Sequence, residues 1–182
     1  MKNMFVKSVG AFGLLVAGTG IAFAQVVVDL PDSSQQTTAT ANVSEQARVT
    51  VPAGVTFNVT DIGSNTPASA ASVSIDRIVL ATATKQLKVS LEAAAANFTP
   101  SVGGAVTWAA ADVSWNAPTW TNATGATGTL SSSAFNEVAT CAADSAACST
   151  TGLVFTLASK TTVKRSGNHT LVMTWKFESI GS

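Results

Sequence analysis

The chain has 182 residues, of which 46% are hydrophobic and 11% charged, with ten basic and ten acidic side chains. Globular proteins ordinarily carry about 25% charged residues, and a neutral balance argues against a nucleic-acid binder or a binder of acidic membranes. So low a charge weakens repulsion between copies and favours contact with other copies or with a matrix. A secreted protein that is merely rich in Ala and Thr fits the composition equally.

Residues 1–24 have the organisation of a secretory signal peptide. A basic start with Lys2 and Lys7 precedes an apolar run from Val9 to Ile21, and Ala22-Phe23-Ala24 suits signal peptidase. A retained membrane anchor is the alternative, but it needs about 20 strongly apolar residues, and this run is short and contains Gly and Ala. We therefore expect cleavage after Ala24, no later membrane span, and a secreted or cell-surface protein that can pass through a periplasm.

Residues 25–42 combine a short strand with a polar tether. Val26, Val28 and Leu30 recur at every second position and would share one face of a strand. The following residues 32–42 have almost no apolar content and lack periodicity, which is typical of a linker. Eleven extended residues span at most about 36 Å. The strand can therefore return to its own domain or reach a neighbouring subunit, and the sequence leaves both open.

Alternating apolar and polar residues predict short strands throughout 43–182. Residues 43–51 and 55–59 are predicted to form a hairpin around Pro52-Ala53-Gly54. Further strands are predicted at 73–80, 86–92, 106–108, 113–115, 130–138, 153–157 and 170–177. About nine strands without a convincing helix predict one all-β domain, an immunoglobulin-like antiparallel β-sandwich of about 8–10 strands.

The last strand has the clearest pattern and is expected to close the core. Within 166–180, every second residue is large and apolar, namely Leu171, Met173, Trp175 and Phe177. The backbone and the apolar face of such a strand need partners from earlier in the chain. The upstream strands are therefore expected to cover it.

Two cysteines, Cys141 and Cys148, lie in the sequence C-A-A-D-S-A-A-C. A close, even pair in an exported chain predicts a disulfide. Closing so small a loop contributes about 2–3 kcal/mol in the chain-entropy model, so we expect it to hold a loop tip more than the fold. With one histidine and no further cysteine, the sequence offers no set of metal ligands, and no cofactor is expected.

No group of residues indicates catalysis. The single histidine, His169, has no G-x-S-x-G serine motif to accompany it. The ten acidic residues are spread singly, so no pair suggests a glycosidase, and no D-x-D-x-D loop suggests calcium. We interpret His169 as a strand residue with a partly packed ring, and we expect a protein that is not an enzyme.

Two tryptophans, Trp115 and Trp120, flank the turn at Pro118. Exposed aromatic faces stack on sugars, which makes this pair the candidate for ligand binding. The alternative is that both pack in the core and its corners. Trp175 is in phase with the core and is not a candidate.

The ending G-N-H-T-L-V-M-T-W-K-F resembles the closing strand of two kinds of exported β-sandwich. WxL-type bacterial cell-surface domains end in an aromatic residue, three residues and an L-T-W-x-L pattern, whose places are taken here, with three substitutions, by His169, Met173, Thr174, Trp175 and Phe177. Pilin-like fimbrial subunits similarly end in a Gly and an alternating strand, and they begin with an apolar strand on a tether; Gly167 and Val26–Leu30 match these features. Either resemblance implies a non-enzymatic surface or filament protein.

We therefore expect a structural subunit of a fimbria, a filament or a biofilm matrix. It would associate with copies of itself or with other cell-surface proteins by adding the strand of Val26, Val28 and Leu30 to a partner's sheet. The second hypothesis is a β-sandwich module that binds cell-wall or other glycan through Trp115 and Trp120.

Overall fold

The computed structural model describes residues 27–31, 33 and 35–182. Its chain divides into two units, residues 1–41 and residues 42–182, and the second holds the strands. The predicted signal peptide and Val26 lie outside the described residues. Val27 to Leu30 form no strand here.

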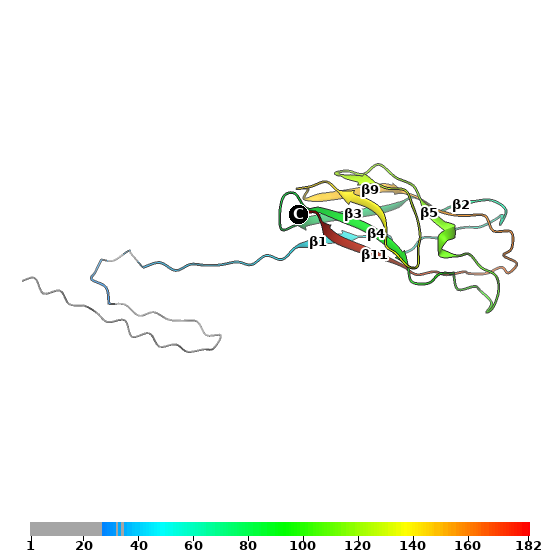
Figure 1. Ribbon diagram of the computed structural model, residues 1–182, viewed down its shortest axis with the longest axis horizontal. Coiled ribbons are helices and arrows are strands. Elements are labelled where there is room, and N and C mark those ends of the chain that lie inside the picture. The colour runs from blue at the N-terminus through cyan, green and yellow to red at the C-terminus, as the bar shows by residue number, and fades with distance from the viewer. Residues whose placement is uncertain (1–26, 32, 34) are drawn as a thin grey trace, which may run out of the picture. The chain divides into compact units, whose positions relative to one another are not determined.

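The unit of residues 42–182 consists of short antiparallel strands and a single turn of 3-10 helix, which confirms the predicted all-β, sandwich-like fold (Figure 1). In chain order its elements are β1 Gln46–Thr50, β2 Thr66–Pro67, β3 Ala71–Val79, β4 Gln86–Ala93, η1 Ala110–Asp112, β5 Val113–Trp115, β6 Ala123–Gly125, β7 Gly128–Thr129, β8 Asn136–Cys141, β9 Ala147–Leu153, β10 Phe155–Leu157 and β11 Met173–Ile180.

The strands form three sheets, with the orders β1-β3-β9, β2-β10-β5-β7 and β11-β4-β8-β6. Only Val154 separates β9 from β10, so the first two sheets follow one another along the same stretch of chain. In Figure 1, β3 and β9 lie on one side of the unit, and β4 and β11 lie on the other. β1 and β11 are both edge strands of their sheets.

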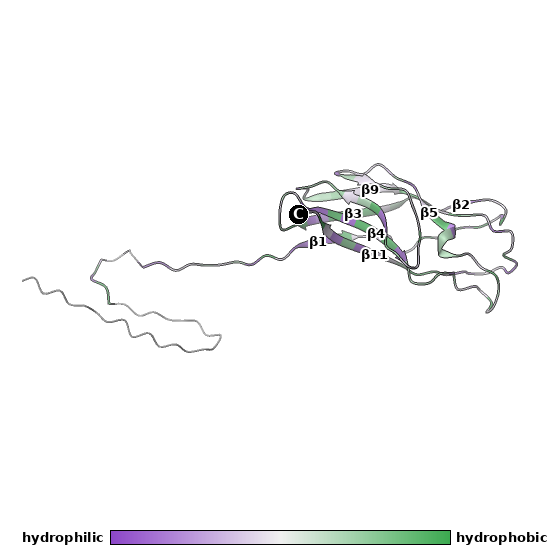
Figure 2. Ribbon diagram, viewed as in Figure 1, coloured by the Kyte–Doolittle hydropathy of each residue, from purple (hydrophilic) through white to green (hydrophobic). Residues whose placement is uncertain are grey.

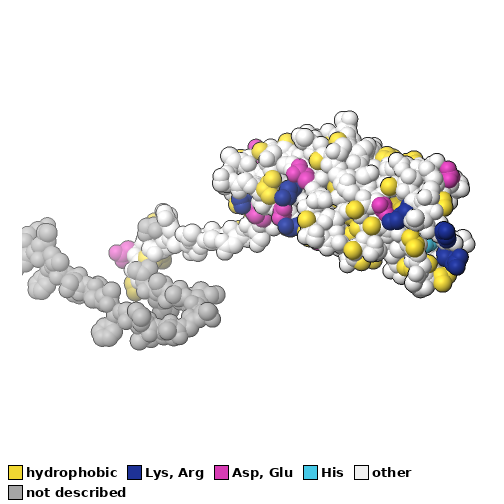
Figure 3. Space-filling view, turned by 45° about the vertical axis from the view of Figure 1, so that its right-hand side comes forward, with side chains coloured by type: hydrophobic (Ala, Val, Ile, Leu, Met, Phe, Trp, Pro, Cys, Tyr) yellow, Lys and Arg dark blue, Asp and Glu magenta, His cyan; other side chains and the backbone are white. Residues whose placement is uncertain are grey.

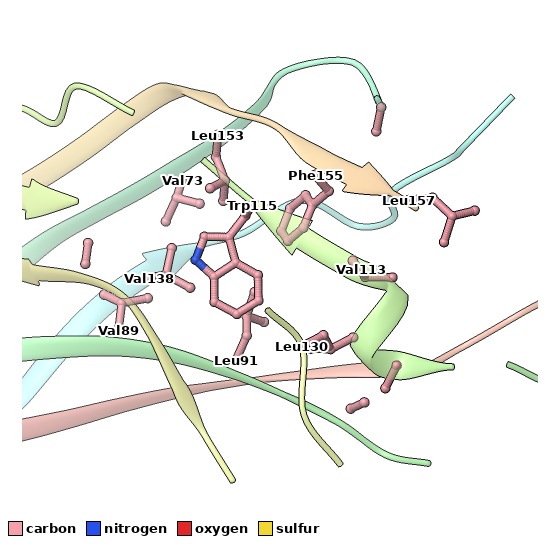
Figure 4. Close-up of a cluster of buried hydrophobic side chains, with 14 of the residues drawn as sticks. Val73, Val89, Leu91, Val113, Trp115, Leu130, Val138, Leu153, Phe155 and Leu157 are labelled. Atoms are coloured by element: carbon pink, nitrogen blue, oxygen red, sulfur yellow. The ribbon is translucent and has the colours of Figure 1, made fainter. Parts of the chain in front are cut away.

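The core lies between these layers. Figure 4 shows Trp115 amid side chains from both layers, with Val73 of β3 and Leu153 of β9 on one side and Val89 and Leu91 of β4 on the other. These residues face the same interior because every second residue of a strand points to the same face. The alternation is visible along β4 in Figure 2.

The disulfide joins Cys141 at the end of β8 to Cys148 in β9, as predicted. The two cysteines are each only 1% exposed, and their strands belong to different sheets. The bond therefore lies within the core, and the expectation that it mainly holds a loop tip stays a prediction. The bond connects the two layers through the core.

The predicted hairpin of residues 43–51 and 55–59 is also wrong. β1 pairs instead with β3, and Arg48 donates two hydrogen bonds to the carboxylate of Asp76, its cross-strand neighbour, at 2.7 and 2.6 Å. Residues 51–60 form no strand. Their alternation nevertheless persists, with Val55, Phe57 and Val59 half-buried and the residues between them exposed.

Candidate functional site

A groove with a volume of about 1060 Å³ runs between two segments that are far apart in the sequence. One wall is formed by residues 55–62, which continue the chain from β1. The other is formed by residues 163–173, which lead into β11. One wall follows the edge strand β1, and the other leads into the edge strand β11.

The first wall is extended chain without a strand partner. Among the described residues, 55–60 form a single backbone hydrogen bond, from Val59 N–H to Phe57 O, at 3.1 Å. Most backbone N–H and C=O groups of this segment are therefore free to pair with another strand. Buried backbone groups are almost always paired, so this wall is suited to receive a strand.

The second wall adjoins the open edge of β11. This strand pairs with β4 along its whole length, from Met173 opposite Ala93 to Ile180 opposite Gln86, and on its other side it has no neighbouring strand among the described residues. An unpaired edge presents a row of donors and acceptors that can template a further strand. Leu171 and Met173 lie in this wall and are half-buried.

The apolar side chains along both walls are only partly covered. Eleven hydrophobic residues are half-buried against the core, and nine of them belong to residues 47–59 or 171–177. Trp175 and Phe177 are two of these, with their rings stacked at 6.4 Å. The core is thus incomplete along one side, between the segment that follows β1 and the segment that becomes β11. The nine are Ala47, Val51, Val55, Phe57, Val59, Leu171, Met173, Trp175 and Phe177.

The two ends of this region differ in how their charged side chains are paired. Lys164 and Arg165 line the groove where its second wall begins, and both are exposed. Figure 3 shows Lys and Arg side chains, in dark blue, beside the histidine. At the end of β11, Glu45 accepts hydrogen bonds from Ala81 N–H at 2.7 Å, Lys85 Nζ at 3.0 Å and Ser179 Oγ at 3.3 Å. The Ala81 N–H, and next the Lys85 ammonium, lower the pKa of Glu45 from its ordinary value of 4.5.

His169 is part of the same wall. Its Nδ1 lies 2.7 Å from Thr107 Oγ1, its Nε2 lies 3.1 Å from the carbonyl oxygen of Arg165, and its ring meets Trp108 edge-on at 5.3 Å. The partly packed ring is confirmed, although His169 precedes β11 instead of lying within it. Both ring nitrogens have partners, so the side chain holds the loop that contains Lys164 and Arg165 against the core.

The loop before His169 is further fixed by Gly167. This glycine has φ of 115°, a conformation that other residues rarely adopt. A Cβ there would also collide with Ser101, whose hydroxyl donates a hydrogen bond to Ser166 O at 2.7 Å. The position of Lys164 and Arg165 is therefore held by backbone geometry on their C-terminal side.

Trp115 and Trp120 do not form an exposed aromatic surface. They are 3% and 7% exposed, and the backbones of Gly128 and Gly125 pack directly against their rings. The prediction that these two tryptophans are exposed, on which the glycan hypothesis depended, is therefore wrong. Small glycines allow β7 and β6 to lie on the indoles, which is why turn residues near Pro118 became core.

The predicted strand donor is only partly described. Val28 is half-buried, Leu30 is 86% exposed, and Val26 lies outside the described residues. Strand donation by this segment stays a prediction, and the groove was not predicted, because residues 55–59 were given a hairpin partner. Two features of the sequence could have indicated the groove. Residues 55–59 alternate directly after the Pro-Ala-Gly turn, and the apolar face of the last strand had no assigned partner.

Comparisons with protein-family models, with curated proteins and with solved structures found no match. Among the described residues, no group of three or more His, Cys, Asp or Glu side chains is placed to hold a metal ion. The same part of the chain has no helix of the length and apolarity needed to cross a membrane.

Proposed function

We propose that this chain is a secreted structural subunit that assembles by β-strand addition. In this proposal, the segment Val26–Leu30 of one copy enters the groove of the next copy and pairs with the open edge of β11. The observation that carries the proposal is the groove itself, whose walls are an extended segment without a strand partner and the segment that leads into the edge strand β11.

The donor and the groove match in period and polarity. Val26, Val28 and Leu30 would project from one face of a strand, with the same spacing of two residues as Val55, Phe57 and Val59 in the wall. Burying three such side chains contributes about 5–8 kcal/mol before the cost of ordering the strand. Leu30, which is exposed in the isolated chain, would gain apolar neighbours.

A second copy is the occupant that the chain's composition favours. Only 11% of the residues are charged, so repulsion between copies is weak. The eleven residues 32–42, nine of them polar, span at most about 36 Å and would form the tether from one folded unit to the groove of another. The resemblance to pilin-like subunits supports the same arrangement, which would build a fimbria, a filament or an extracellular matrix.

The first test compares assembly of the mature chain, taken from Gln25, with two single variants. Val28→Asp places a charge on the inserted face and should leave a monomer. Val27→Asp places the same charge on the opposite face and should assemble like the parent. Light scattering after size-exclusion chromatography measures the mass, and electron microscopy shows whether filaments form. A parent chain that stays monomeric at high concentration, with its strand docked on its own core, contradicts the proposal.

A mixing experiment tests whether one copy donates the strand and the next copy accepts it. A chain with Val28→Asp and Leu30→Asp keeps its groove but lacks a functional donor, so it can accept a strand and cannot give one. Adding it in small amounts to the parent chain should shorten the assemblies, as a chain terminator does. The Val27→Asp chain should leave their length unchanged. Equal effects of the two additions would argue against strand donation.

A further inference from the structure

We infer that Lys164 and Arg165 bind the acidic flank of the incoming strand, Asp29 followed by Asp32, and thereby fix the direction in which the strand lies in the groove. This inference rests on the proposed function, because it assigns a specificity-determining pair to the same groove. It concerns the recognition of one copy by another through opposite charges at the groove's rim.

The basic pair stands out among the cations of the described residues. Of the eight Lys and Arg side chains after the signal peptide, five form ion pairs within the folded unit: Arg48, Lys85, Lys88, Lys160 and Lys176. Of the remaining three, Arg77 lies on β3 next to Asp76. The other two are Lys164 and Arg165, which are adjacent, exposed and at the groove.

The donor segment carries the complementary charge. Between Gln25 and Ala47 the sequence has three acidic residues, Asp29, Asp32 and Glu45, and no Lys or Arg. With Val28 and Leu30 directed into the groove, the side chain of Asp29 lies on the opposite face of the strand. Its carboxylate is then at the solvent-exposed rim, where the side chains of Lys164 and Arg165 are also accessible.

The position of the pair determines the direction of the strand. Lys164 and Arg165 precede the start of β11, and the acidic residues lie at the C-terminal end of the donor. Contact between them therefore places the donor antiparallel to β11. With the strand reversed, Asp29 would lie away from this basic pair and toward the end of β11, where Glu45 already receives Lys85.

This direction has a consequence for how copies connect. The donor's tether would leave the groove at the Lys164 end. The acceptor's own chain enters its folded unit at the other end, where Glu45 lies beside Ser179. Each copy would then use one end to receive a strand and the other to extend its own. Such head-to-tail contacts do not close on themselves unless the rotation between copies permits a ring.

The test is a charge exchange in the mature chain. Lys164→Glu with Arg165→Glu should raise the concentration needed for assembly by about tenfold or more, since like charges now face each other. Asp29→Lys with Asp32→Lys should have a similar effect. Combining all four substitutions should restore assembly toward that of the parent. Assembly of the parent should also weaken as salt is raised from about 0.05 to 0.5 M, because exposed charges are screened.

Arg77→Glu is the matched control for Arg165→Glu, because it makes the same change at an exposed site outside the groove lining. It should leave assembly unchanged, and thermal unfolding should show that all variants are folded. If charge reversal at Lys164 and Arg165 has no effect, or if the fourfold exchange does not restore assembly, the inference fails. The proposed function still stands in that case if Val28→Asp abolishes assembly. If the parent itself never assembles, both fail.

Discussion

Gly128 shows how closely the two layers of this protein approach each other. A Cβ at this position would collide with the indole ring of Trp115, which is buried in the centre of the core. The glycine is therefore needed for its small size, and its own backbone covers the ring. This contact is also the reason why Trp115 cannot serve as an exposed sugar platform.

Replacing Gly128 with Ala should destabilise the fold by about 1–3 kcal/mol, because an extra methyl group in a packed core forces neighbours to shift. Gly54→Ala is the matched control, since its Cβ would meet nothing within 4 Å. Urea unfolding followed by tryptophan fluorescence measures both variants. Equal stability of the two would show that the Trp115 contact is looser than described.

Removing the disulfide by Cys141→Ala with Cys148→Ala should lower the free energy of unfolding by about 2–3 kcal/mol, as expected for a short closed loop. The bond lies between β8 and β9 in different sheets, so its loss should be felt across the core. Chemical denaturation gives the value, and the parent chain under reducing conditions is the control. A loss confined to faster exchange of the loop at residues 142–146 would support the loop-tip interpretation.

The strands that were predicted correctly are those with partners on both sides or a strong alternation. β4 has β11 and β8 as neighbours and buries four of its apolar residues, so its pattern is complete in the sequence. β11 alternates as predicted, although Trp175 and Phe177 are only partly covered. Local pattern determines which face of a strand points inward, and this is what the sequence conveys most directly.

Pairing was less predictable than strand identity. The turn at Pro52-Ala53-Gly54 is compatible with a hairpin, but β1 pairs with β3, about 25 residues further along the chain. The choice depends on long-range contacts such as the Arg48–Asp76 pair. The groove could not be predicted for the same reason, because residues 55–59 would alternate in the same way whether or not a strand paired with them. Only the arrangement of both edges shows it.

Hydrogen exchange should distinguish these elements. In the monomeric Val28→Asp chain, the amides of residues 55–60 should exchange rapidly, since they have almost no backbone partners. In assemblies of the parent chain, the same amides and the outer amides of β11 should be protected. The amides of β4, which is already paired on both sides, serve as the internal control. Protection of residues 55–60 in the monomer would mean that the groove is already filled.

The charges of the folded unit predict its response to acid. Four carboxylates, two exposed and two half-buried, have a pKa below their ordinary values: Glu45, Asp61, Asp76 and Glu178. Hydrogen bonds from the Ala81 N–H, the Gly63 N–H, the Arg48 guanidinium and the Lys176 ammonium, respectively, are the leading causes. A carboxylate whose pKa is lower in the folded state stabilises the fold at pH values above its unfolded pKa. That stabilisation is lost as pH falls through the folded value.

Thermal stability should therefore be nearly constant from neutral pH to about pH 5 and should decline below the ordinary carboxylate values of 4.5 and 3.8. Thermal unfolding across this range measures the effect, which should be modest because all four groups remain accessible to solvent. Asp76→Asn should flatten part of the decline, since it removes one lowered pKa. A melting temperature that rises on acidification would contradict this assignment.

The pairing of β1 with β3 has a mechanical consequence for copies joined as proposed. Tension along a filament of such copies would enter each folded unit at the start of β1. It would leave the unit through the donated strand beside β11. Because β1 lies antiparallel to β3, the force would act along the strands, in shear. It would load the backbone hydrogen bonds between β1 and β3 and the two hydrogen bonds from Arg48 to Asp76 together, instead of opening them one by one. From β9, the neighbour of β3, the load would cross to the other layer through a covalent link, Cys148 to Cys141.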